Sequence, residues 1–195
     1  MATDALDRAV LGPALLLVRL AGPAPAGRTE DWSGHLGPEL VLRDAGTAPG
    51  WPRVAAELDQ AGSLPWALLA PARTGPAALR LARQAADAGR PPGHVVLWPA
   101  AEPAAATAEL TAARAELAAA GGQPLPCPVT VLLTAPDGRE TEGTGGWHGL
   151  TAAALTVRML PSADPGAPTG CGDGTAARSI AIARTVKEEL QVWPA

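Results

Sequence analysis

Short unbroken runs of apolar residues recur along this chain, separated by stretches with helical or turn character. The runs lack the alternation of a half-exposed strand, and this is typical of strands that are buried on both faces of a sheet. They cover residues 14–20, 64–70, 94–98 and 129–134, and a briefer run over 39–43 predicts a further strand. The pattern therefore predicts a sheet whose strands lie inside the molecule.

Helical patterns fill the spaces between these runs. Pro52 suits the first turn of a helix that Gly62 can end, and Thr74 can cap a second helix that stops at Gly89. The predicted helices cover residues 52–61, 76–88, 103–120, 150–160 and 175–190, and the turn 136–138 predicts a hairpin with 139–144. We expect the first two turns of the last helix to be buried and its final turn to be solvated. Strands alternating with helices predict one α/β domain over residues 1–195, layered helix–sheet–helix, with a largely parallel or mixed sheet.

The composition narrows the classes of protein that remain. Hydrophobic residues make up 47% of the chain and the net charge is −4, so the chain is too apolar for disorder and shows no footprint for nucleic acid or an anionic membrane. Phe, Tyr and Asn are absent, and six Trp are the only large aromatic residues. A core of Ala, Leu and Val is shallow, and we expect a homo- or heterodimer.

Cysteines and histidines are sparse. The two cysteines do not predict a disulfide framework, and the three histidines lack the spacing of a metal site. We expect neither a metal nor a cofactor. Asp4 and Asp7 argue against a signal peptide, and the run 15–18 is far too short to span a bilayer, so the sequence predicts a cytoplasmic protein.

The stretch Pro168-Thr169-Gly170-Cys171-Gly172-Asp173-Gly174 runs directly into the last helix. A helix N-terminus lowers the pKa of a thiol and stabilises anions, whereas a neighbouring carboxylate such as that of Asp173 raises the thiol pKa. A nucleophile elbow, a phosphate cradle and a plain glycine-rich loop with Asp173 as helix cap all fit this stretch. In the first case Cys171 is the nucleophile, and the N–H groups of Gly172 and Gly174 stabilise the oxyanion.

The same stretch resembles the Thr-x-Cys-x-x-Gly elbow of thiolase-fold ketosynthases. The Gly/Pro-rich residues 22–27, the acidic-aromatic residues 28–32, the segment 79–98 and the Ala-rich segment 150–160 follow in that family's order. The resemblance implies the first half of a thiolase-like fold that accepts an acyl group on Cys171 from an acyl carrier protein. A ketosynthase also needs two later histidines, and none follows Cys171 here. What this resemblance implies is an accessory subunit in polyketide or fatty-acid-type biosynthesis that depends on a ketosynthase partner chain and is not catalytic by itself.

Two alternatives stay open at this point. Residues 169–173 are similar to the Gly-x-Gly-Asp signature of ribokinase-like sugar kinases, which implies Asp173 as general base, although a chain without Asn cannot hold that family's Asn-x-x-Glu magnesium motif. A purely structural or interaction domain is the other alternative. His148 lies in a glycine-rich segment and is the candidate base for the elbow, though a surface loop histidine is the commoner case. His94 fits a hydrogen-bonded polar group at a strand end, and Cys127 fits a structural role.

Overall fold

The computed structural model describes residues 15–20, 32–46, 49–71, 74–98, 115, 123–134, 149–160 and 173–191. Within these ranges the strands are β1 (Leu15–Leu20), β2 (Leu40–Gly46), β3 (Trp66–Pro71), β4 (His94–Trp98), β5 (Val129–Thr134) and β6 (Leu155–Leu160). The helices are α1 (Ser33–Leu36), α2 (Trp51–Ala61), α3 (Gly75–Asp87) and α5 (Asp173–Gln191). No described helix is long and apolar enough to cross a membrane.

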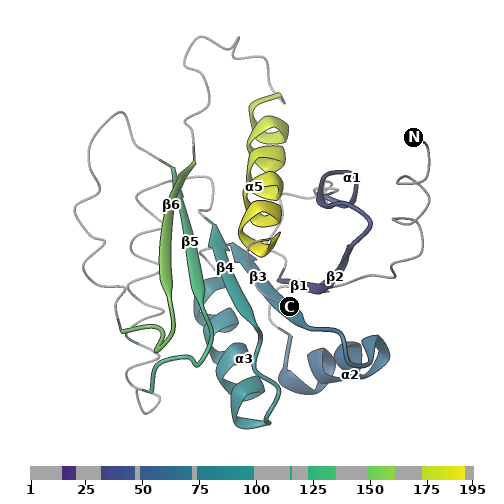
Figure 1. Cartoon of the computed structure of the whole chain (residues 1–195), viewed down its shortest axis with the longest axis vertical. Coiled ribbons are helices and arrows are strands. Elements are labelled where there is room, and N and C mark those ends of the chain that lie inside the picture. The colour runs from purple at the N-terminus through teal and green to yellow at the C-terminus, as the bar shows by residue number, and fades with distance from the viewer. Residues whose placement is uncertain are drawn as a thin grey trace, which may run out of the picture.

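The six strands form one sheet in the order β2-β1-β3-β4-β5-β6, and every neighbouring pair is parallel (Figure 1). The chain first moves from β1 outward to β2. It then crosses to the other side of β1 and adds β3 through β6 in sequence order. The direction of winding therefore reverses between β1 and β3, which makes this pair the topological switch point of the sheet.

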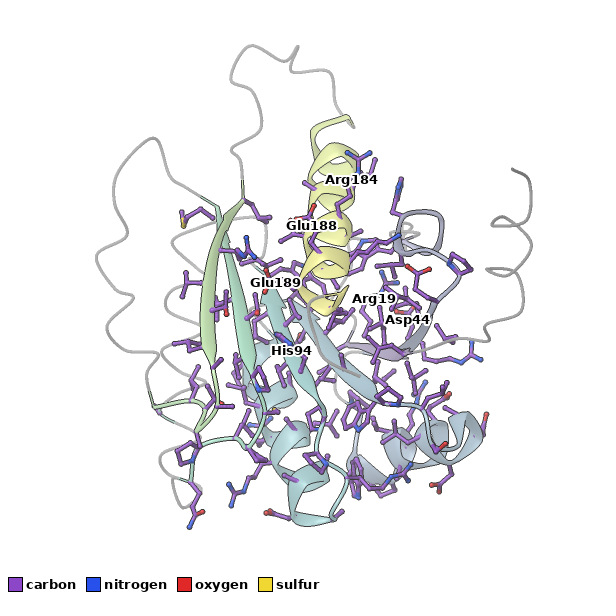
Figure 2. The ribbon with its side chains drawn as sticks, in the orientation of Figure 1. Arg19, Asp44, His94, Arg184, Glu188 and Glu189 are labelled. Carbon is purple, nitrogen blue, oxygen red and sulfur yellow. The ribbon has the colours of Figure 1, made fainter. Side chains whose placement is uncertain are left out.

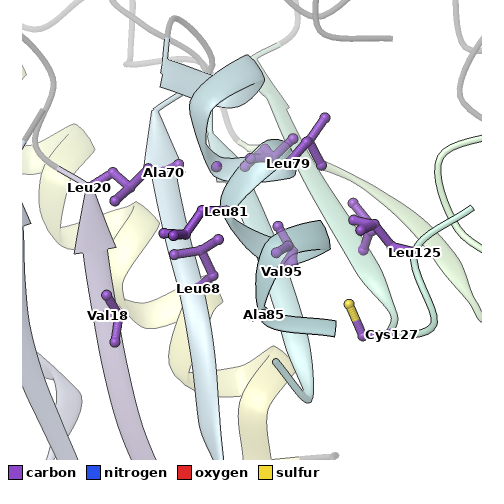
Figure 3. Packing of buried hydrophobic residues seen from close by; sticks show 14 of the residues in the cluster. Val18, Leu20, Leu68, Ala70, Leu79, Leu81, Ala85, Val95, Leu125 and Cys127 are labelled. Carbon is purple, nitrogen blue, oxygen red and sulfur yellow. The ribbon is translucent and has the colours of Figure 1, made fainter. Parts of the chain in front are cut away.

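Helices cover both faces of this sheet (Figure 1). On one face α2 and α3 pack over the even-numbered side chains of β1 and β3, in a cluster that includes Leu16, Leu68 and Leu79. Figure 3 shows this cluster with the β5 side of the core, where Leu125 and Cys127 join it. On the opposite face α1 and α5 pack over the odd-numbered side chains of the same strands. The second cluster contains Leu15, Leu17, Ala67, Leu69, Val96, Trp98, Leu132, Leu160, Trp32, Leu36, Ile182, Ala183, Val186 and Leu190.

Burial on both faces explains why the sequence pattern predicted the strands well. Every residue of β1, β3 and β4 is buried, so neither face of these strands requires polar residues, and the apolar runs are continuous. The expected α/β architecture with a parallel sheet is confirmed. The expected strands near 14–20, 39–43, 64–70, 94–98 and 129–134 are all present.

The helices α2 and α3 also lie where the pattern placed them. Gly62 and Gly89 follow them with φ of +71° and +75°, the left-handed region in which glycine is favoured. Thr74 is the N-cap of α3, but its hydroxyl donates to the carbonyl of Pro71 at 3.0 Å and accepts no hydrogen bond from the N–H groups of the helix.

The helix expected over residues 150–160 is wrong, because Leu155–Leu160 is strand β6. Its residues pair in register with β5, from Val129↔Leu155 to Thr134↔Leu160. Three consecutive alanines before Leu155 suggested a helix, and the β-branched Thr156 and Val157 were the strand signal that this interpretation overlooked. The expected helix over 103–120, apart from helical Ala115, and the expected strand over 139–144 lie outside the described residues.

The last helix, α5, is confirmed, and it begins at Asp173. The prediction that its final turn is solvated is wrong, because Glu189 and Leu190 are both buried. Leu190 belongs to the cluster under α5, and Glu189 makes polar contacts with the sheet that are described below. The charged residues near the end of α5 therefore point in different directions, since Arg184 and Glu188 are exposed.

Candidate functional site at the carboxyl edge of the sheet

Open α/β sheets bind ligands outside the carboxyl ends of their strands, at the point where the strand order reverses. In this chain that place is the carboxyl edge around β1 and β3. Chemistry-bearing residues of the α5-covered face reach it from separate elements. Arg19 comes from β1, Asp44 from β2, Trp32 from the start of α1 and Trp98 from the end of β4.

Arg19 is the central group of this set. Its Nε lies 2.5 Å from Oδ1 of Asp44 and its Nη2 lies 2.9 Å from Oδ2, so the guanidinium holds the carboxylate at two points. The guanidinium carbon lies 5.2 Å from the centre of the Trp32 ring, within the range of a cation–π contact. Figure 2 shows Arg19 and Asp44 side by side, next to the carboxyl half of α5. Arg19 is 7% exposed, so its charge is buried but paired.

Trp32 and Trp98 extend this contact across the face of the sheet. Their ring centres are 5.0 Å apart and the ring planes are tilted by 52°. This separation lies within the range of 4.5–7 Å over which aromatic rings attract each other. We call Arg19, Asp44, Trp32 and Trp98 the edge cluster. It joins β1, β2, β4 and α1 by side-chain contacts.

The turn from β3 into α3 also lies at this edge. A strand–turn–helix junction of this kind can present a catalytic serine or cysteine above the carboxyl edge of a parallel sheet. Here residues 71–75 read Pro-Ala-Arg-Thr-Gly, and the only hydroxyl in the turn, on Thr74, is buried and hydrogen-bonded to Pro71. The junction therefore offers no exposed serine or cysteine.

A second polar group lies under α5, toward the amino ends of the strands. The Nε2 of His94 lies 2.9 Å from the hydroxyl oxygen of Thr130, and Thr130 donates to Oε2 of Glu189 at 3.2 Å. Since the single hydroxyl proton goes to Glu189, Thr130 can only accept from His94, and His94 therefore carries a proton on Nε2. The other oxygen of Glu189 lies 2.6 Å from Nε of Arg158 on β6. We call His94, Thr130, Glu189 and Arg158 the helix clasp, because it fastens α5 to β4, β5 and β6.

The helix clasp combines a hydroxyl, an imidazole and a carboxylate, yet its order does not suit nucleophilic catalysis. In a triad the imidazole lies between the hydroxyl and the carboxylate and accepts the hydroxyl proton. Here the hydroxyl lies in the middle and is completely buried. Burial also lowers the pKa of His94, while the nearby Glu189 acts in the opposite direction. The expectation that His94 is a hydrogen-bonded strand-end group is confirmed.

The residues that the sequence singled out stand apart from this geometry. Cys171, Gly172 and His148 lie outside the described residues. Asp173 and Gly174 open α5, as expected, and only their backbone is described. Cys127 is buried, and burial raises the pKa of its thiol to about 11, so it is a weak nucleophile at neutral pH. The described residues contain no group of His, Cys, Asp and Glu that could hold a metal ion.

Sequence reasoning missed Arg19, Asp44 and Glu189. One signal was available, because Arg19 interrupts the run Leu15-Leu-Leu-Val-Arg-Leu20, and a charge inside a buried strand needs a partner. The partners themselves are separated by 25 residues in the edge cluster and by 36 and 59 in the helix clasp. Such pairs become visible only when the strand order is known.

Comparison with solved structures identifies the fold. The chain is similar to the RedJ thioesterase of the prodiginine pathway in Streptomyces coelicolor, with 18% identity, a TM-score of 0.53, and coverage of 88% of this chain and 85% of that one. It is similar to the SrfTE domain, described as cyclising the lipopeptide antibiotic surfactin, with 12% identity, a TM-score of 0.57 and coverage of 93% and 94%. ClbQ of the colibactin NRPS/PKS pathway gives 14% identity, a TM-score of 0.54 and coverage of 93% and 99%. No protein-family model matches the chain, and no curated protein matches it in sequence.

The chain therefore has the α/β-hydrolase type of fold seen in thioesterases. The expected thiolase-like half fold is wrong, and so is the ribokinase-like alternative. The chain covers most of the length of each named thioesterase, whereas a half fold would leave much of its relatives unmatched. The resemblance to ketosynthases rested on a six-residue elbow before a helix and on the order of further segments between residues 22 and 160, and neither of these specifies strand order. The ketosynthase-like function and the acyltransferase activity were inferred from the same resemblance. The similarity to thioesterases contradicts both of them.

Proposed function

We propose that this chain is a thioesterase-type protein of polyketide or nonribosomal-peptide biosynthesis, and that it acts on an acyl group joined as a thioester to a carrier protein. The observation that carries the proposal is the similarity of almost the whole chain to several thioesterases, among them proteins from prodiginine, surfactin and colibactin synthesis. The carrier protein that was expected as a partner fits this class of reaction. The proposed binding place is the carboxyl edge of the sheet, beside the edge cluster.

The sequence bears differently on binding of the acyl thioester and on its hydrolysis. In α/β hydrolases a serine on a Gly-x-Ser-x-Gly turn attacks, and a histidine that follows it and the acidic residue in the chain completes the triad. This sequence contains no Gly-x-Ser-x-Gly and no equivalent pattern with cysteine, and its last histidine, His148, precedes β6. The primary proposal is therefore that the chain binds the acyl thioester. Hydrolysis by this chain requires a nucleophile other than an elbow serine.

Cys171 is the thiol that we propose for that role. It lies in the connection from the carboxyl end of β6 to Asp173, the first residue of α5. Attack by its sulfur on the thioester carbonyl would form an acyl-enzyme and release the carrier thiol, and water would then release the acid and restore the thiol. His148 is adjacent to Gly149, which precedes the amino end of β6. The topology thus gives no support for His148 as the base that acts with Cys171.

The test uses the full chain and an acyl thioester loaded on a carrier protein. Binding is followed by calorimetry, with the unacylated carrier as control, and hydrolysis is followed by release of the carrier thiol. We expect the acylated carrier to bind more tightly than the unacylated one. Equal affinity, or no binding, contradicts the proposal. Thiol release above the uncatalysed rate assigns hydrolysis, and its loss in Cys171→Ala assigns the nucleophile.

A further inference from the structure

The sheet of the described residues ends in two edge strands, β2 and β6, and their outer edges differ (Figure 1). Edge strands carry main-chain groups that can pair with another chain, and charged side chains or bulges protect them. On β2 the charged Arg43 and Asp44 are adjacent, and the pairing with β1 shifts its register close to them. Strand β6 keeps an unbroken register with β5, and its one charge belongs to Arg158, which pairs with Glu189 of α5. Strand β6 is therefore the less protected edge.

The main-chain groups of β6 point alternately toward β5 and toward the outer edge. The N–H of Val129 on β5 donates to the carbonyl of Ala154 at 2.9 Å, so the groups of Ala154 and of every second residue after it face β5. Those of Leu155, Val157 and Met159 therefore face outward. Among the residues that the structure describes, no strand pairs with this side of β6. Each outward residue presents one hydrogen-bond donor and one acceptor there.

The side chains of the same outward residues share one face of β6. Leu155 packs against the cluster under α2 and α3, whereas Leu160 belongs to the cluster under α5, so the odd-numbered residues lie on the α3 side. Val157 is partly buried and Met159 is 49% exposed. Within the described ranges, no other large apolar side chain is exposed. The outer edge thus combines outward main-chain groups with a row of apolar side chains.

We propose that β6 pairs antiparallel with β6 of a second copy of this chain, across a two-fold axis at Val157, so that the two sheets become continuous. Val157 then lies opposite its own copy, and Leu155 lies opposite Met159. Every outward donor and acceptor of these residues has a partner in this register. A register shifted by two residues leaves one of them without a partner, and the shift toward the carboxyl end also brings two Arg158 guanidinium groups opposite each other.

The choice of a second copy as the occupant follows from this symmetry. A two-fold contact joins the same surface from both sides, so the surface must be complementary to itself. The outer edge of β6 meets this condition, because Leu155 and Met159 form an apolar pair on one face. On the other face Thr156 lies opposite Arg158, so the guanidinium that holds Glu189 meets a hydroxyl rather than a like charge. The dimer expected from the composition thereby acquires a specific interface, which does not depend on the proposed function.

Sedimentation equilibrium of the full chain over a range of concentrations measures the dimer. A single pair of strands is a small interface, so we expect reversible dimerisation with micromolar affinity. Val157→Pro removes the outward N–H and leaves the bonds to β5 intact, and edge strands accept proline at such positions. We expect this variant to dimerise at least about tenfold more weakly, because the hydrogen bonds at the axis are lost, and to keep a urea midpoint close to that of the wild-type chain. A monomeric wild-type chain, or wild-type affinity in Val157→Pro, overturns the proposal.

A pair of charge variants tests the register without relying on proline. Val157→Lys and Val157→Glu each place like charges opposite each other across the axis, so we expect each variant alone to be monomeric. An equimolar mixture of the two should dimerise again, because opposite charges then face each other. Gln84→Lys and Gln84→Glu, at an exposed position of α3, are the matched controls and should dimerise as the wild-type chain does. A mixture that stays monomeric, or a dimer that survives in each Val157 variant alone, contradicts pairing at this edge.

Discussion

The edge cluster and the helix clasp lie on the same face of the sheet, but their buried polar groups are satisfied in different ways. The edge cluster pairs full charges on β1 and β2, and the Asp44 side chain keeps 42% of its surface exposed. The helix clasp passes a chain of hydrogen bonds from His94 through Thr130 to Glu189, and only the outermost group, Arg158, is largely exposed. Figure 2 shows Arg19 and Asp44 on one side of the lower part of α5, and His94 below the other side.

This difference indicates what each set contributes. The helix clasp lies toward the amino ends of β4 and β5, away from the edge where parallel α/β sheets bind ligands. Each polar atom in it depends on the next, so its loss should affect stability first. The edge cluster lies at the carboxyl edge and its Asp44 side chain is partly solvated, so its loss should cost less stability than loss of the helix clasp. The following substitutions test this division.

The largest effect is expected at the centre of the helix clasp. Thr130→Val keeps the shape of the side chain but removes the hydroxyl, and with it the buried hydrogen bonds to Nε2 of His94 and Oε2 of Glu189. We expect the free energy of unfolding to fall by about 3 kcal/mol, because each unsatisfied buried group costs roughly 1–3 kcal/mol. Urea denaturation measures the change. Thr130→Ser, which keeps the hydroxyl, is the control, and an equal loss in both variants would show that packing rather than hydrogen bonding is responsible.

Next in size is the loss of one partner from the edge cluster. Asp44→Leu leaves the buried Arg19 guanidinium without its carboxylate, and we expect a loss of about 2 kcal/mol, reduced from the usual cost of a broken buried pair because Asp44 is partly solvated. A double-mutant cycle with Arg19→Leu measures the coupling. Recovery of stability in the double variant is the expected outcome, and an additive loss would be evidence against the contrast drawn between the two clusters.

A smaller effect should appear in the pH dependence of stability. Burial holds the pKa of His94 below the ordinary 6.5, so the unfolded chain takes up a proton first as the pH falls. Stability is then highest above pH 6.5 and decreases as the pH falls toward the folded-state pKa of His94, with a slope of at most about 1.4 kcal/mol per pH unit. Urea midpoints between pH 5 and 8 provide the measurement. The slope should be reduced in His94→Gln, and an identical slope in that variant would exclude His94 as its source.

The smallest effect is expected for an exposed ion pair outside both clusters. Asp59→Ala removes the partner of Arg90, and the Asp59 side chain is 71% exposed. Exposed pairs contribute little, so we expect a change below about 0.5 kcal/mol in the free energy of unfolding. Thermal unfolding of the two chains side by side is sufficient. A change as large as that of Asp44→Leu would remove the distinction between buried and exposed pairs.

The sequence predicted the elements of this fold better than their arrangement. Runs such as 94–98 identify buried strands because both faces are apolar, and Gly62 and Gly89 mark helix ends because of their backbone conformation. Leu155–Leu160 was missed because a short apolar segment after alanines fits either a strand or a helix, and only pairing with β5 decides between them. Strand order depends on contacts between distant segments, which no local pattern reports.

The candidate site was less accessible to sequence reasoning for the same physical cause. The cysteine-containing stretch 168–174 attracted attention because its residues are adjacent in sequence. The edge cluster brings together Arg19, Trp32, Asp44 and Trp98 from four separate segments, so no single segment shows that they meet. The charge of Arg19 within an apolar strand was the one local indication that a partner had to exist.

The position of α5 also has a consequence for how the molecule reaches its native state. This helix, formed by residues 173–191, covers a sheet whose first strand, β1, begins at Leu15. Contacts over so long a sequence separation, in a sheet that is entirely parallel, are formed slowly because loop closure must precede them. During synthesis, Leu15, Leu17 and Leu69 stay without the cover of α5 until the last residues of the chain described here have emerged. Such a chain is exposed to self-association until that moment, and a chaperone that binds apolar strands would be most effective there.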